Sequence, residues 1–214
     1  MRLNPRLAEI LAPAYQPCVE FSRSCKEMRW KPESGHIPRG FLGAGGSVRE
    51  VELILVFAEP GDPHASEIHT GMESAYAYAY DCFKIGKDLF HRNVRMILSL
   101  CWPNLSFDEQ MRKAWLTESV LCSARAEGGS VSAMASRACG MHYLYPQLAQ
   151  FPNALIVALG NKAQNRLRTL GISSFLPAVA AAPPGCNRRD ALASWQKIPV
   201  ALRQRKQEHA ERCK

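Results

Sequence analysis

The segment VELILVF at residues 51–57 is an almost continuous apolar run, and it ends abruptly in AEPGDPH at residues 58–64. A run of this kind is typical of a strand that is buried on both faces of a parallel sheet. Pro60, Gly61 and Pro63 exclude a helix or a strand interior immediately after it. The sequence therefore predicts a buried strand that ends in a loop.

Strands and helices alternate on both sides of this strand. Upstream we expect a helix over 2–11 and a glycine-rich loop over 34–48. Downstream we expect helices over 72–88, 132–148 and 162–170, strands over 115–121, 154–159 and 175–182, and a last helix capped by Asp190. This alternation predicts a single three-layer α/β domain around a mostly parallel, four-stranded sheet. The domain would span residues 1–214, with a core over about 18–200 and a basic tail over about 204–214.

Composition narrows the class of protein. A chain of 214 residues with 47% apolar content suits one domain better than two. Lys and Arg number 27 against 19 acids, so the net charge is +8. A basic surface favours polyanions, although the same charge could serve solubility alone. Membrane-length apolar runs and the apolar core of a signal peptide are absent from the sequence, so we expect a soluble, cytoplasmic monomer.

Three predicted strand ends carry unusual residues, at 58–64, 117–122 and 182–189. Because ligands of parallel sheets bind at the carboxyl edge of the strands, we expect these segments to form one site. In this order, VFAEPG (56–61), TESVLC (117–122), ALIVALG (154–160) and APPGCN (182–187) resemble the motifs of the uracil-DNA glycosylase superfamily, especially its iron–sulfur branch. The resemblance covers most of residues 18–189.

The resemblance implies a uracil-DNA-glycosylase-like fold and an enzyme that flips a base out of DNA and hydrolyses its N-glycosidic bond, leaving an abasic site. The water-orienting carboxylate would be Glu59, or Asp62 in a shifted register. A histidine of the family that stabilises the departing base is replaced here by Ala182. His64 or His69 could take over that role.

The resemblance also implies ligands for a 4Fe–4S cluster. The matching cysteines are Cys18, Cys25, Cys122 and Cys139, and four thiolates are what such a cluster requires. Cys18 and Cys25 stand further apart than the family's first pair. Zinc on the same four residues, or four buried thiols without metal, are the open alternatives. Disulfides are not expected in a reducing compartment.

The base-binding positions depart from the family in one informative way. The resemblance places Ala58, Ser74, Glu118 and Asn187 around the flipped base, and Glu118 stands where the family has an asparagine. An ionised glutamate only accepts hydrogen bonds, which suits the N4 amino group of cytosine, and a protonated one could also donate to N3.

The aromatic platform that the family places under the base falls here on Ser74, although Tyr76 or Tyr78 could substitute for it. A wider pocket would result. Arg188 and Arg189 would contact DNA phosphates.

We therefore expect a glycosylase for a modified cytosine, such as the glucosylated hydroxymethylcytosine of phage DNA, with DNA as its partner and an antiviral role. Three alternatives stay open. They are a repair enzyme for uracil or another deaminated base, a DNA-binding protein without catalysis, and a metal-bound structural or redox protein.

Overall fold

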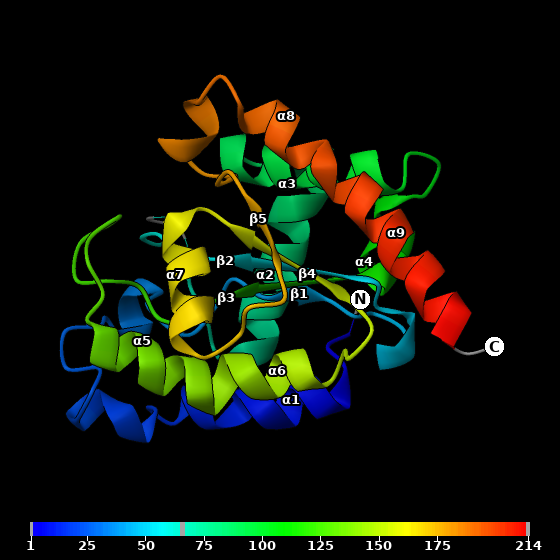
Figure 1. Ribbon diagram of the computed structural model, residues 1–214. Helices are drawn as coiled ribbons and strands as arrows, with labels where there is room; N and C mark the ends of the chain where they lie inside the picture. Colours follow the sequence, from blue (N-terminus) through cyan, green and yellow to red (C-terminus); the bar gives the residue numbers. More distant parts are fainter. Residues whose placement is uncertain (1, 65–66, 213–214) are drawn as a thin grey trace.

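A five-stranded mixed sheet forms the middle of the molecule in the computed structural model, which describes residues 2–64 and 67–212 (Figure 1). The strands are β1 (Leu42–Gly43), β2 (Leu53–Phe57), β3 (Ala114–Glu118), β4 (Leu155–Leu159) and β5 (Leu176–Ala178). The α-helices are α1 (Pro5–Leu11), α2 (Met72–Ile85), α3 (Leu89–Cys101), α4 (Phe107–Lys113), α5 (Ala133–Cys139), α6 (Tyr145–Ala149), α7 (Asn161–Thr169), α8 (Ala191–Trp195) and α9 (Lys197–Arg212). Helices cover both faces of the sheet, so the chain is a single α/β domain.

The order of the strands is β1-β3-β2-β4-β5. β3, β2, β4 and β5 run parallel to one another, and the short β1 pairs with β3 in the opposite direction. In the register of β2 with β3, Phe57 lies opposite Glu118. The segments that follow these two strands therefore emerge side by side at the carboxyl edge of the sheet.

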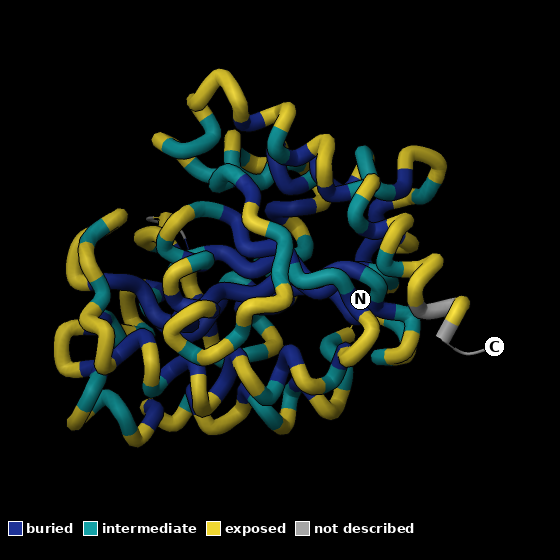
Figure 2. The backbone as a smooth tube through the Cα atoms, in the orientation of Figure 1, coloured by how far each residue is buried: buried dark blue, intermediate teal, exposed yellow. Residues whose placement is uncertain are grey.

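Layers of helices flank the sheet on its two sides. α1, α5 and α6 lie along one side, and α3, α8 and α9 lie along the other (Figure 1). Burial follows the same pattern, since β1, β2 and β3 are buried throughout and the outer turns of the helices are exposed (Figure 2). Within the described residues, no helix combines the length and the apolar character that crossing a membrane requires.

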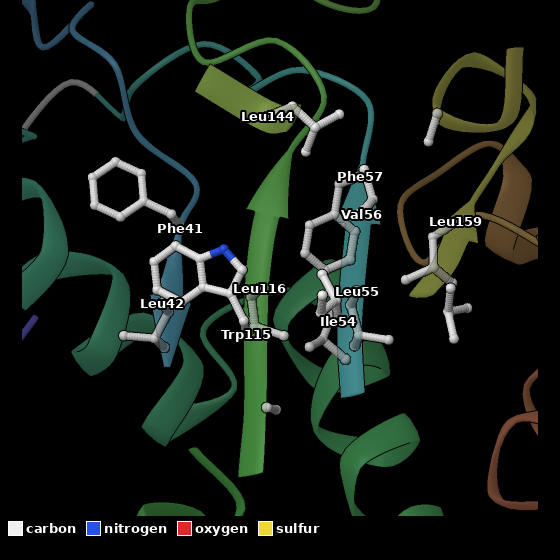
Figure 3. Packing of buried hydrophobic residues seen from close by; sticks show 14 of the residues in the cluster. Phe41, Leu42, Ile54, Leu55, Val56, Phe57, Trp115, Leu116, Leu144 and Leu159 are labelled. Atoms are coloured by element: carbon white, nitrogen blue, oxygen red, sulfur yellow. The ribbon is translucent and has the colours of Figure 1, made fainter. Parts of the chain in front are cut away.

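Trp115 on β3 is the largest fully buried side chain and organises the core beside β1. Its ring stacks on Phe41 with centroids 6.2 Å apart (Figure 3). The indole Nε1 donates to Gln147 Oε1 over 3.0 Å, and Thr117 Oγ1 donates to the same oxygen over 2.8 Å. These bonds satisfy polar groups that burial would otherwise leave unpaired.

The prediction of four strands was wrong by one, because β1 has only two residues and lies in the glycine-rich loop. The prediction of one helix over 72–88 was also wrong at its end. Gly86 adopts a left-handed conformation with φ +66° and ends α2, and Asp88 then caps α3. The expected charged tail from about 204 is largely helical, since α9 continues to Arg212.

Candidate functional site

A cavity of about 570 Å³ opens at the carboxyl edge of the parallel strands. The loop after β2, the end of β3 and the loop after β5 line one part of it, and α2 and the start of α3 line another. Residues 39–40 and 127–128 and the end of β4 complete the lining. Of the residues expected to form the site, Ala58, Glu59, Asp62, His64 and Glu118 line this cavity, and so does Ala182. The structure thus brings together residues from all three predicted strand ends.

Glu59 is buried at the cavity wall, where two cations from α7 bind its carboxylate. Arg166 Nη2 lies 2.5 Å from Oε2, and Lys162 Nζ contacts Oε1. Arg166 also donates to the carbonyl oxygen of Ala58, and Lys162 donates to that of Gly129 over 2.7 Å. The carboxylate therefore ties α7 to the loop after β2, and its charge is fully compensated.

Glu118 ends β3 and its side chain is only 5% exposed. Burial, and then the charge of Glu59, raise the pKa of this carboxyl group well above its usual range, against the lowering effects of Arg166 and Arg39. Oε2 has no hydrogen-bond partner among the described residues. A neutral carboxyl group offers one donor and one acceptor, so Glu118 can bind a ligand through both.

Gly40 makes room for the Glu118 side chain. It adopts φ +86°, and a Cβ atom built on it would lie 2.5 Å from Glu118 Cγ and 2.9 Å from Oε1. Any side chain at this position would be strained and would displace the carboxyl group.

Asp62 and His64 stand at the rim of the cavity. Asp62 Oδ1 lies 2.9 Å from Arg29 Nη1 and 3.6 Å from His36 Nε2. His64 is exposed, and its backbone N–H donates to Glu67 Oε2 over 3.1 Å. Asp62 is therefore engaged in an ion pair with Arg29, whereas His64 is exposed and lines the cavity.

His69 belongs to a buried charged cluster that the sequence analysis did not identify. Its Nε2 lies 2.7 Å from Glu67 Oε1, and Arg39 Nε lies 3.4 Å from the same oxygen. Arg39 and Glu67 line the cavity, but His69 does not. The ring of His69 packs edge-on against Tyr78, which does line the cavity. Of the two tyrosines considered as a platform, Tyr78 lines the cavity, whereas Tyr76 is a core residue.

Four other expected site residues lie outside the cavity lining. Ser74 caps the start of α2, where its hydroxyl group accepts from Thr70 N over 2.8 Å. Asn187 is exposed in a 3₁₀ turn, and Arg188 pairs with Asp190 over 2.6 Å. Arg189 is exposed beside them.

Asp88 and His91, at the start of α3, line the cavity and were not identified from the sequence. The sequence does contain a helix-start pattern here, since an aspartate precedes an apolar periodic run. The prediction of one continuous helix over 72–88 missed this start.

The four expected cluster ligands, Cys18, Cys25, Cys122 and Cys139, are all buried, with 7–8% of each residue exposed. Burial raises the pKa of Cys122 well above its usual range, and the negative charges of Cys139, Cys25 and Cys18 raise it further. Burial likewise raises the pKa of Cys25 to about 11 and that of Cys139 to about 12. All four cysteines belong to the buried hydrophobic core.

These thiols fit a cluster in kind and in number. Within residues 2–64 and 67–212, no three His, Cys, Asp or Glu side chains are placed to hold one metal ion. A four-iron cluster is larger than a single ion, so its thiolates stand further apart than those of a zinc site. Bound metal would also supply the positive charge that keeps buried thiolates ionised.

Asn93 on α3 positions the loop that follows β5. Its Nδ2 donates to the carbonyl oxygen of Ala181 over 2.8 Å, which fixes Ala182 at the cavity wall. This wall is apolar where the resemblance would place a histidine. No family model matches this chain, and no curated protein is similar to it, so the geometry of this cavity carries the argument about function.

Proposed function

We propose that this protein is a DNA glycosylase that flips a base into the cavity and hydrolyses its N-glycosidic bond. The observation that carries the proposal is the buried, unpartnered carboxyl group of Glu118 in a cavity at the carboxyl edge of a parallel sheet. Burial of such a group is costly unless a ligand completes its hydrogen bonds. The edges of nucleobases carry the donor and acceptor pair that a neutral carboxyl group matches.

The proposed fold relationship is to the uracil-DNA glycosylase superfamily. The order of the matched segments along the chain and their meeting at one cavity support it. The cluster proposed on Cys18, Cys25, Cys122 and Cys139 would be structural, because binding of metal to buried thiolates is coupled to folding.

The proposed substrate is a modified cytosine in foreign DNA, such as glucosylated hydroxymethylcytosine, which would give the protein an antiviral role. The cavity of about 570 Å³ has the size of sites that hold ligands larger than a bare base. The hydroxyl group of Tyr78 lies in the part contributed by α2, where it could bind the hydroxyl groups of a substituent.

Uracil is the second candidate, because a neutral Glu118 also matches it. The carboxyl O–H would donate to uracil O4, and the carbonyl oxygen would accept from N3–H. The raised pKa of Glu118 therefore favours neither base by itself. Uracil is the ordinary substrate of the superfamily that the sequence resembles.

The decisive experiment incubates the protein with plain DNA, uracil-containing DNA and phage DNA that carries glucosylated hydroxymethylcytosine. Abasic sites are then counted by alkaline strand cleavage. We expect abasic sites in the modified DNA above all. Salt-dependent binding with no abasic sites in any substrate would instead identify a DNA-binding protein without glycosylase activity.

A further inference from the structure

The wall of the cavity at the start of α3 carries an aspartate–histidine pair. Asp88 caps the helix by accepting from the backbone N–H of His91 over 3.0 Å. The same Oδ1 atom lies 2.8 Å from His91 Nδ1. One carboxylate oxygen therefore holds both the backbone and the ring of His91.

Aromatic side chains hold the ring from its other sides. Phe83 of α2 packs edge-on at 4.5 Å between centroids, and Phe90 does so at 5.2 Å. The His91 side chain is 15% exposed, and Nδ1 is fully buried. Nε2 is therefore the ring nitrogen available to the cavity. The approach of Nδ1 to Asp88 is not aligned as an ideal hydrogen bond, which is common for catalytic pairs before a substrate binds.

Burial has the largest influence on the protonation of the His91 ring. Burial lowers the pKa of His91 below its usual value of 6.5, Asp88 partly offsets this effect, and Lys87 and His64 lower the pKa again. Because Asp88 has its own pKa lowered, despite burial, by its contacts with His91, it is an anion that favours a proton on Nδ1. Nε2 then carries a lone pair and can accept a proton.

Glu59 is less suited to accept a proton. Its carboxylate is bound by Lys162 and Arg166, so the three side chains together carry a charge of +1. Both oxygens of its carboxylate are engaged by cations. His91 is therefore the better placed group for proton transfer.

We propose that His91, positioned by Asp88, is the catalytic base of this cavity. The proposal rests on the glycosylase function proposed above. A water oxygen bonds to C1′ of the sugar while the C1′–N bond breaks, and the electron pair of that bond leaves with the base. The water proton moves to His91 Nε2, and the imidazolium then returns it to the nitrogen of the departing base. Hydrolysis is thus balanced without any further reactant.

The first test compares His91→Gln with Asp88→Asn under single-turnover conditions on the best DNA substrate. His91→Gln should lower the rate of bond cleavage about 100-fold or more and leave the Kd for DNA unchanged. Wild type should show an acid limb in its pH–rate profile, because protonation of His91 removes the base.

Asn retains the helix cap, so Asp88→Asn should fold normally. It should shift the acid limb to lower pH, because Asp88 raises the pKa of His91. A purely structural role would not move the limb. His142→Gln is the matched control, since the side chain of His142 is 52% exposed and does not line the cavity. Cleavage by His91→Gln within a few-fold of wild type would overturn the assignment while the glycosylase function stood.

A second measurement is independent of activity. NMR titration of the His91 ring should show a neutral ring with its proton on Nδ1, a pKa below 6.5, and a further decrease in Asp88→Asn. Added free cytosine should shift the Nε2 resonance in the folded protein. If wild type cleaves no DNA, the proposed function fails. The assignment of His91 then fails too if the ring proton is on Nε2 or the base leaves the Nε2 resonance unchanged.

Discussion

Arg166 Nη2 lies 2.5 Å from Glu59 Oε2, so a helix that follows β4 is joined to the loop that follows β2 across the carboxyl edge of the sheet. Both side chains are largely buried, with 10% and 5% of their surface exposed. The pair holds the cavity wall in place, and this geometry bears on how Glu59 responds to substitution.

Glu59→Gln should abolish cleavage and also destabilise the protein. The amide leaves Arg166 without its anion, and loss of one partner from a buried pair costs about 3–5 kcal/mol. Thermal unfolding and abasic-site assays would measure the two effects. Glu127→Gln is the matched control, because Glu127 also lines the cavity but is exposed. If Glu59→Gln cleaves DNA at close to the wild-type rate, the water-orienting carboxylate would be Asp62 instead.

Glu118→Gln should make the protein more stable at neutral pH. Because the pKa of Glu118 is raised, its carboxyl group adds to the free energy of unfolding below the usual pKa of 4.5. This contribution is lost as the pH rises towards the pKa of the folded state. Between these two pKa values, the free energy of unfolding of the variant should increase relative to wild type by about 1.4 kcal/mol per pH unit. Urea unfolding at pH 4.5, 6 and 8 checks this expectation.

Glu52→Gln provides a control with the opposite sign. Burial alone would raise the pKa of Glu52, but hydrogen bonds from Lys206 and Lys113 lower it overall. Its stabilising contribution is therefore present at neutral pH and is lost on acidification. Identical pH dependence of stability in the Glu118→Gln variant and wild type would contradict a neutral Glu118.

Glu118→Asn should shift specificity towards uracil, because an asparagine amide always donates a hydrogen bond, whereas a carboxyl group that loses its proton only accepts and then disfavours uracil O4. A well-placed bidentate contact is worth about 1–3 kcal/mol, which corresponds to roughly ten- to a hundredfold in relative rate. Cleavage of matched oligonucleotides with modified cytosine or uracil gives the ratio. An unchanged ratio of the two cleavage rates would mean that Glu118 does not determine which base is removed.

The anaerobically purified protein should be brown, with four iron atoms per chain expected for a 4Fe–4S cluster. Cys139→Ser should lose iron and much of its folded structure, since cluster binding is coupled to folding. Cys82→Ser is the control, because Cys82 is also buried but lies on α2 outside the four-thiol group. A colourless, iron-free protein that is fully folded would refute the cluster.

DNA binding should weaken steeply as salt increases, given the net charge of +8. Arg189→Ala should reduce the slope of log K against log salt by about 0.9, the value for one phosphate contact. Arg112→Ala tests for a general charge effect, since Arg112 lies on α4, which leads into the amino end of β3. Equal slopes for the two variants would show that Arg189 has no phosphate contact.

The strands next to the cavity could be predicted from the sequence because burial on both faces leaves a continuous apolar run. β2 and β4 lie within the predicted runs, and β3 and β5 overlap their predictions but are shorter. Their carboxyl ends brought Glu59 and Glu118 together as expected. β1 could not be predicted, because two residues carry no periodic pattern.

The contacts of the site were less predictable than its location. In the sequence, Lys162 and Arg166 are ordinary polar residues of an amphipathic helix. Only the pairing of β4 with β2 brings them to Glu59. His91 lies on a helix whose start was read as the end of the helix before it. Long-range pairing determines which charges meet, and local patterns do not contain that information.

Gly40 and Glu118 have a consequence for how this cavity can diversify. Since a methyl group at position 40 would collide with Glu118, position 40 tolerates a side chain only at the cost of displacing this carboxyl group. Gly40→Ala should push the carboxyl group into the ligand space, and Gly40→Ala with Glu118→Ala removes the Cγ and Oε1 atoms with which the methyl group would collide. The depth of the cavity thus depends on Gly40, which has no side chain. Among descendants of this chain, substrate range should follow residue 40 as closely as residue 118.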